Sequence, residues 1–203
     1  PLEAIISGAD SIKEFKAESP GIWSFHDPSL QRSASKYGNA EWVYVEGSPL
    51  ERAETADRLF PGSFMQDFEG KKVYLYLSED LKPEDASIEY ARRQGLIWVK
   101  KPLDDIHVIG FTLIHSASPL AGRPSLMCQG QRWLIQGNHI LWSSYACRST
   151  SWCRNVVVRD NIIEWGGVAS AGGGRAINLL FENNILRYSN WRRTDPGFDG
   201  GSK

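Results

Sequence analysis

Asn155-Val-Val-Val-Arg-Asp-Asn161-Ile-Ile-Glu-Trp165 is followed by a second segment of the same pattern, Asn178-Leu-Leu-Phe-Glu-Asn-Asn184-Ile-Leu-Arg-Tyr188. The asparagines in the middle of the two segments are 23 residues apart. The same interval before Asn161 leads to a third copy, Trp133-Leu-Ile-Gln-Gly-Asn138-His-Ile-Leu-Trp142, and a weaker fourth copy surrounds Phe111. Self-similarity at a fixed period of this length is the sequence signature of a solenoid.

Apolar residues recur at three positions of each copy, counted from the shared asparagine. They stand five residues before it (Ile106, Trp133, Val156, Leu179), three before it (Val108, Ile135, Val158, Phe181) and two after it (Leu113, Ile140, Ile163, Leu186). The spacing of two predicts strands, and a leucine-rich repeat would need a stricter leucine spacing. We therefore predict an all-β right-handed parallel β-helix. The repeated asparagine should form a turn ladder, because Asn tolerates a left-handed bend and its amide can bond to the next turn of chain.

Composition limits the partners that the chain can have. With 203 residues it suits one or two domains. Its apolar runs stay well below the ~20 residues that span a membrane, and its net charge of −1 gives no reason to expect a nucleic-acid partner. Nine of the ten basic residues from 105 to 203 are arginines. This favours an anionic or sugar ligand, although arginines on exposed edges would give the same count.

The three cysteines, Cys128, Cys147 and Cys153, show no metal-ligand spacing, and no two share a position in successive copies. Buried reduced thiols are the expectation, and a Cys147–Cys153 bridge remains open. We expect no metal site and no cofactor.

The first half of the chain does not show the repeat and instead has short strand patterns separated by turns. Leu2 to Gly8 alternates like a strand and could belong to a first β-helix coil, which we assign to residues 1–14. Phe64 to Gly70 and Lys72 to Leu77 predict a β-hairpin, and Gly95 to Val99 another strand. We assign residues 15–99 to an inserted antiparallel β module and residues 100–203 to the parallel β-helix coils.

This order of pieces resembles carbohydrate-active enzymes in which a β-sandwich interrupts a parallel β-helix near its N-terminus, a group that includes β-xylosidases. The resemblance rests on Ala40-Glu-Trp-Val-Tyr-Val-Glu-Gly47, Phe60-Pro-Gly-Ser-Phe64, Lys72-Val-Tyr-Leu-Tyr-Leu77, Ile109-Gly-Phe-Thr112 and Asp199-Gly-Gly-Ser-Lys203. It implies a secreted or periplasmic enzyme that acts on polysaccharides. In such enzymes the catalytic carboxylates lie in later coils. We therefore expect the chain to be a fragment, with its last coil capped by further chain or by self-association.

Glycoside hydrolysis needs two carboxyl groups about 5–9 Å apart. The weak candidates here are Glu164 and Asp199. Glu164 should lie opposite Arg187 of the next copy and form a surface ion pair. Asp160 and Glu182 stand beside the turn asparagines and should face solvent or cap turns.

One repeat position carries only large rings: His115, Trp142, Trp165 and Tyr188. Such a column is most often packing, but it could also be a sugar platform that Arg187, Trp191, Arg192 and Lys203 would extend. We predict glycoside hydrolase-like chemistry on a polysaccharide or oligosaccharide. The alternatives are a lyase of the same fold, which would use Ca²⁺, and a glycan-binding or scaffold module without catalysis.

Overall fold

The computed structural model describes residues 4–33, 39–78, 80–118, 124–145, 147–149, 153–168 and 176–188. These residues form strands and two short 3-10 helices, so the fold is all-β. The chain divides into two compact units. Unit 1 combines the chain up to Ala9 with the chain from Arg92 onward, and unit 2 is Asp10–Ala91. Within the described residues no helix is long and apolar enough to cross a membrane.

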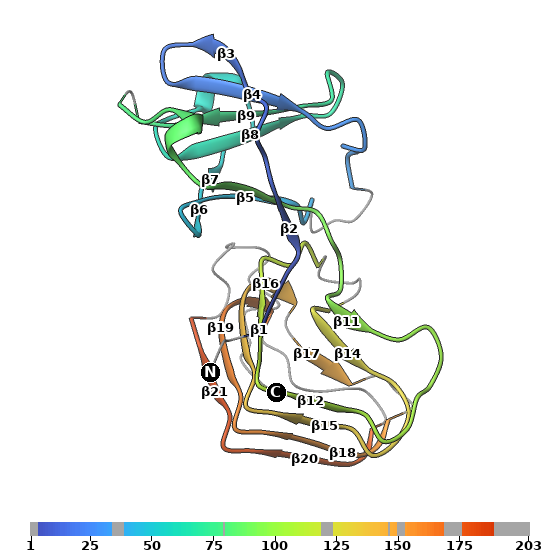
Figure 1. Cartoon of the computed structure of the whole chain (residues 1–203). Coiled ribbons are helices and arrows are strands. Elements are labelled where there is room, and N and C mark those ends of the chain that lie inside the picture. Colours follow the sequence, from blue (N-terminus) through green and yellow to red (C-terminus); the bar gives the residue numbers. More distant parts are fainter. Residues whose placement is uncertain are drawn as a thin grey trace. The chain divides into compact units, whose positions relative to one another are not determined.

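Unit 1 contains three parallel sheets (Figure 1). Sheet A has the order β1 (Ala4–Ser7), β13 (Phe111–Ile114), β16 (His139–Tyr145), β19 (Ile162–Val168) and β21 (Ile185–Arg187). Sheet B has the order β12 (His107–Ile109), β15 (Leu134–Gln136), β18 (Arg154–Arg159) and β20 (Ile177–Glu182). Sheet C has the order β11 (Ile97–Trp98), β14 (Leu126–Cys128) and β17 (Cys147–Ser149). Every neighbouring pair in these sheets is parallel.

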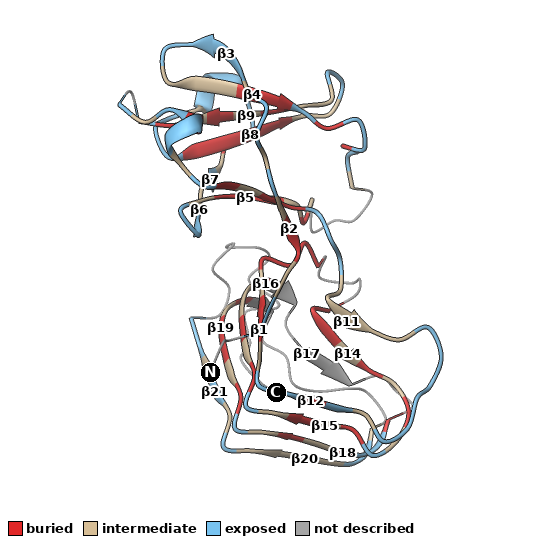
Figure 2. Cartoon of the chain, in the orientation of Figure 1, coloured by how far each residue is buried: buried red, intermediate tan, exposed pale blue. Residues whose placement is uncertain are grey.

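The strand register stacks the apolar positions of successive copies. In sheet B, Val108 lies opposite Ile135, which lies opposite Val158, and Phe181 follows; in sheet A the corresponding column is Leu113, Ile140, Ile163 and Leu186. The first three members of each column are buried (Figure 2). The fourth members, Phe181 and Leu186, are partly buried and pack against the same core. The columns expected from the sequence are therefore confirmed as the core of unit 1, because alternate strand residues point to one face.

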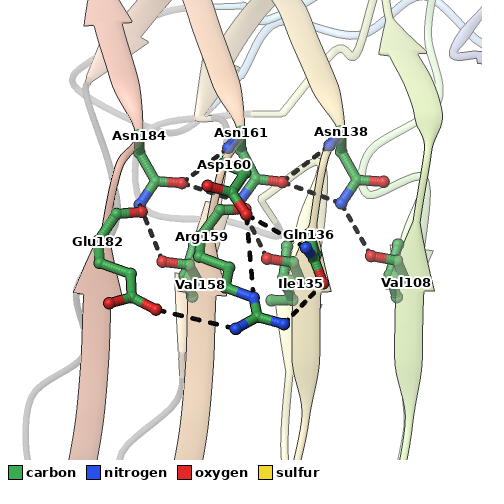
Figure 3. Close-up of polar contacts among 10 residues, drawn as sticks. All are labelled: Val108, Ile135, Gln136, Asn138, Val158, Arg159, Asp160, Asn161, Glu182 and Asn184. Atoms are coloured by element: carbon green, nitrogen blue, oxygen red, sulfur yellow. Dashed lines mark hydrogen bonds and ion pairs between the residues drawn. The ribbon is translucent and has the colours of Figure 1, made fainter.

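The asparagine ladder is present, and each rung joins neighbouring turns of chain (Figure 3). Oδ1 of Asn161 accepts from the backbone N–H of Asn138 at 2.9 Å and from its side-chain amide at 3.0 Å. Asn184 accepts from Asn161 in the same way, at 3.0 and 2.8 Å. At Phe111 only the backbone N–H takes part, donating to Asn138 at 3.0 Å. The amide groups thus satisfy backbone donors and carbonyls where the chain turns between sheets.

The left-handed bend lies one residue earlier than we expected. Gly110, Gly137, Asp160 and Asn183 have φ values of 72°, 63°, 56° and 52°, whereas the ladder asparagines have no positive φ. Glycine, Asp and Asn tolerate this conformation better than other residues. The preceding residue therefore turns the chain, and the ladder asparagine that follows it is left to make the hydrogen bonds between successive turns.

Unit 2 contains two sheets. Sheet D has the order β2 (Ala9–Ser11), β10 (Ile88–Ala91), β5 (Trp42–Val45) and β6 (Ser48–Pro49). Sheet E has the order β3 (Lys16–Ser19), β4 (Ile22–His26), β9 (Lys72–Tyr76), β8 (Ser63–Asp67) and β7 (Glu51–Arg52). The 3-10 helices are Ala56–Arg58 and Pro83–Asp85. Strands β8 and β9 pair antiparallel with Met65 opposite Tyr74, so the predicted hairpin is confirmed.

Two strands from the first hundred residues, β1 and β11, join the parallel sheets of unit 1. Strand β1 pairs in parallel with β13, with Ile5 opposite Thr112, as expected for an early strand of the repeat region. Strand β11, which we expected within the antiparallel module of residues 15–99, instead pairs in parallel with β14. Its two residues, Ile97 and Trp98, were too short a run to show which sheet they would join.

Candidate functional site

The outer side of sheet A carries a cluster of polar side chains. Because Leu113, Ile140 and Ile163 point into the core, their neighbours in the strands point outward. One outward column is Thr112, His139, Ile162 and Ile185, and the other is Ile114, Leu141, Glu164 and Arg187. Three strands that are distant in sequence therefore bring His139, Glu164 and Arg187 onto one face.

Glu164 is held by two basic side chains. Its Oε2 accepts from Nε of Arg187 at 2.5 Å, and its Oε1 lies 2.7 Å from Nε2 of His139. The ion pair between Glu164 and Arg187 is confirmed, but the expected surface location is wrong for the carboxylate. The Glu164 side chain is only 11% exposed, compared with 51% for Arg187 and 34% for His139.

Burial raises the pKa of Glu164, but hydrogen bonds and charge from Arg187 and His139 outweigh it, so its pKa lies below the usual 4.5. The Glu164 carboxylate raises the pKa of Arg187 in turn. Glu164 is therefore ionised at neutral pH and serves as a hydrogen-bond acceptor. When His139 is neutral, it must carry its proton on Nε2 to donate to this carboxylate.

No second carboxylate is recorded in contact with Glu164 among the described residues. In the described part of residues 92–188 the other acidic residues are Asp104, Asp105, Asp160 and Glu182, and each is next to an arginine. Arg132 binds Asp105 through Nε at 2.6 Å. Asp160 and Glu182 lie beside Arg159 with partly exposed side chains, as expected (Figure 3). Asp199 lies outside the described residues.

The aromatic column follows directly after the Glu164 column. The ring of Trp165 stacks on Trp142 with centroids 4.8 Å apart and on Tyr188 with centroids 4.4 Å apart, at interplanar angles of 14° and 18°. His115, at the same repeat position, is buried. All four residues have left-handed backbones, with φ between 52° and 58°. Large side chains are rare at such φ values, so the stacking must compensate for the backbone strain.

This stacking decides which ring surfaces a ligand can reach. Both faces of Trp165 are covered, by Trp142 on one side and Tyr188 on the other. A sugar ring that stacks on an aromatic face therefore has no access to Trp165, where only ring edges remain. Tyr188 is 52% exposed, and the guanidinium of Arg187 lies 5.4 Å from its ring centroid. Among the described residues, Tyr188 and Arg187 thus form the last and most exposed rung of the column, next to Glu164.

The remaining candidates from the sequence cannot be placed. Trp191, Arg192 and Lys203 lie outside the described residues. Within the part of the chain that is described, no group of three His, Cys, Asp or Glu side chains could hold a metal ion. The sequence analysis missed His139 as a partner of Glu164. The signal was available in the repeat, because His139 aligns with Ile162 and lies diagonally beside Glu164 on the next strand.

The sequence of the chain matches no protein-family model and no curated protein. Its fold is similar to that of a solved structure described as "The complex structure of XylC with xylose", with a TM-score of 0.77 and 14% sequence identity. The match covers 94% of this chain but only 44% of XylC, so the chain spans less than half the length of that protein. The likeness therefore establishes a shared fold, extending over both units.

Proposed function

We propose that unit 1 is part of a right-handed parallel β-helix and that the outer side of sheet A binds a carbohydrate through Glu164, Arg187, His139 and Tyr188. The three parallel sheets with residues in register support the fold assignment. The fold shared with XylC, a protein solved with xylose, supports a carbohydrate as the ligand. The observation that carries the proposal is the cluster of Glu164 with His139 and Arg187 at the exposed end of the aromatic column.

The chemistry of the cluster suits a hydroxyl-rich ligand. Arg187 uses Nε for Glu164 and is half exposed, so its terminal N–H groups can donate to sugar hydroxyls. Glu164 fixes the guanidinium in place, which lowers the entropy lost when a ligand binds. The partly exposed ring of Tyr188 offers an apolar surface beside these donors. Together they form an amphipathic patch that matches the polar edge and apolar face of a pyranose.

The whole protein would act on glycosidic bonds, as a glycoside hydrolase of secreted or periplasmic location. Glycoside hydrolysis needs an acid and a second carboxylate. Glu164 is ionised and paired with the Arg187 guanidinium, so it is poorly suited to donate a proton. We therefore assign the described face to binding and orientation of the saccharide. The purified chain should not turn over an aryl glycoside. Turnover that disappears in Glu164→Gln would contradict this assignment.

Binding is tested by titrating the 203-residue chain with xylose and xylo-oligosaccharides, followed by NMR shifts or calorimetry. Glu164→Gln and Arg187→Gln should each weaken binding by about tenfold, which corresponds to the loss of one charged hydrogen bond. Arg132→Gln is the matched control, because Arg132 is 50% exposed and also pairs with a carboxylate, but belongs to the turn that enters sheet B. If all three variants bind like the wild type, the proposed face is not the site. A chain that binds no saccharide at millimolar concentration would refute the function itself.

A further inference from the structure

Two cysteines of unit 1 lie against each other in its core. Cys128 ends β14, and Cys153 stands directly before β18, 25 residues later. Both side chains are fully buried. Their sulfur atoms are 3.6 Å apart, and the thiol of Cys153 donates a hydrogen bond to the backbone carbonyl of Cys128 at 3.1 Å. The two residues do not share a register position, because Cys128 lies opposite Ser149, so the contact between their side chains could not be read from the repeat.

The pair lies on neighbouring turns of chain. The N–H of Arg154, the residue after Cys153, donates to the carbonyl of Gly130 at 3.0 Å, so the backbones run side by side next to both cysteines. Because the two cysteines are not opposite each other in the strand register, it is their side chains that bring the sulfur atoms into contact. Because a disulfide bond is about 2.0 Å long, the present contact is a non-bonded one that needs the sulfurs to approach by roughly 1.6 Å.

We propose that Cys128 and Cys153 are a site of oxidative modification and form a disulfide when the chain folds in an oxidising environment. The oxidant is a small-molecule disulfide such as oxidised glutathione. The thiolate of one cysteine attacks it, forms a mixed disulfide and releases one reduced glutathione. The second cysteine loses its proton and attacks the protein sulfur of the mixed disulfide. This step forms the Cys128–Cys153 bond and releases a second glutathione.

Burial determines when the reaction can occur. Neither thiol reaches solvent in the folded unit, so oxidant must react before the core closes or during its transient opening. Once the two turns of chain pack together, the contact between the two side chains holds the thiols at a high effective concentration. The bond would tie two successive turns of unit 1 across a 25-residue segment. Such cross-links persist in oxidising compartments and are rare in reducing ones.

The test refolds the full chain in a mixture of oxidised and reduced glutathione, and in parallel in a reducing buffer. The oxidised product should be lighter than the reduced one by the mass of two hydrogen atoms. Digestion without reduction should give one cross-linked peptide pair that contains Cys128 and Cys153. After denaturation, maleimide should label a single thiol per oxidised chain, compared with all three in the reduced chain.

Variants separate this pairing from the alternative bridge between Cys147 and Cys153. Cys147→Ser should retain the cross-link, and Cys128→Ala should lose it. Oxidation should also raise the thermal midpoint of the wild type and of Cys147→Ser by several degrees, and dithiothreitol should reverse that rise. If Cys128→Ala does not fold, the peptide map of the wild type and of Cys147→Ser still decides. Three reactive thiols after oxidative refolding, or a cross-link through Cys147, would overturn the proposal.

Discussion

Nε of Arg187 donates to Oε2 of Glu164 at 2.5 Å across the parallel pair β19 and β21, and this bond fixes a half-exposed cation on an almost buried anion. The other carboxylate oxygen contacts His139, so neither oxygen of Glu164 depends on solvent alone. This arrangement differs from an ordinary surface ion pair because the carboxylate has lost most of its hydration. Its removal should therefore have a measurable effect on stability.

Glu164→Gln should lower the free energy of unfolding by about 1–2 kcal/mol, because one charged hydrogen bond is lost and an amide N–H₂ is placed against a basic side chain. Urea denaturation of wild type and variant measures this difference. Asp105→Asn is the control, since solvent screens the exposed Asp105–Arg132 pair and its loss should change the free energy of unfolding much less. Equal effects of the two substitutions would show that burial of Glu164 adds nothing.

The pH dependence of the Glu164 contribution has a defined sign. The pKa of Glu164 is lower in the folded state than its usual 4.5, so the unfolded chain takes up a proton first as the pH falls. The stability that Glu164 contributes is therefore fully present above about pH 5.5 and decreases as the pH falls through the folded-state pKa. Urea titrations from pH 7 to pH 3 should show the wild type and Glu164→Gln converging in acid. A difference that grows toward low pH would reverse the assigned sign.

Asn161→Asp should destabilise the chain by about 3 kcal/mol or more. The side-chain amide of Asn161 donates to the carbonyls of Ile135 and Arg159 at 3.0 and 2.8 Å. A carboxylate at this buried position has no N–H to donate, so it would lose both hydrogen bonds and be repelled by the two carbonyl oxygens. Asn178→Asp is the matched control, because Asn178 is exposed and bonded to Asn155, and its cost should stay within about 0.5 kcal/mol. Comparable losses in the two variants would argue against the ladder as a stabilising element.

Trp165 tests the balance between backbone strain and stacking. Trp165→Ala should lower the free energy of unfolding by about 3 kcal/mol, because contacts on both faces of the ring are lost. Trp165→Gly should be more stable than Trp165→Ala by up to about 1 kcal/mol, since the φ of 53° suits glycine. At most strand positions the alanine variant is the more stable of the two, because glycine loses more conformational entropy on folding. Thermal or urea unfolding of the two variants gives the order directly.

The sequence was informative wherever a pattern repeated. The columns through Ile135 and Ile140 could be predicted because apolar residues recur at fixed distances from Asn138, and burial then decides which side faces the core. The pairing of Glu164 with Arg187 followed from the same register. Strand β11 was placed in the wrong module because Ile97 and Trp98 have no repeat partner of their own in sequence.

The sequence by itself therefore determined the period, the inward columns, the asparagine ladder and the row of aromatic residues, because each depends on which residues recur and at what spacing. Tertiary structure alone decided which residue of each turn takes the left-handed backbone, how deeply Glu164 is buried, and that His139 approaches it. It also brought Cys128 against Cys153, two residues whose spacing of 25 departs from the 23-residue period. These features depend on distances between side chains on adjacent turns, which are set by the packing of the whole core and not by any single segment.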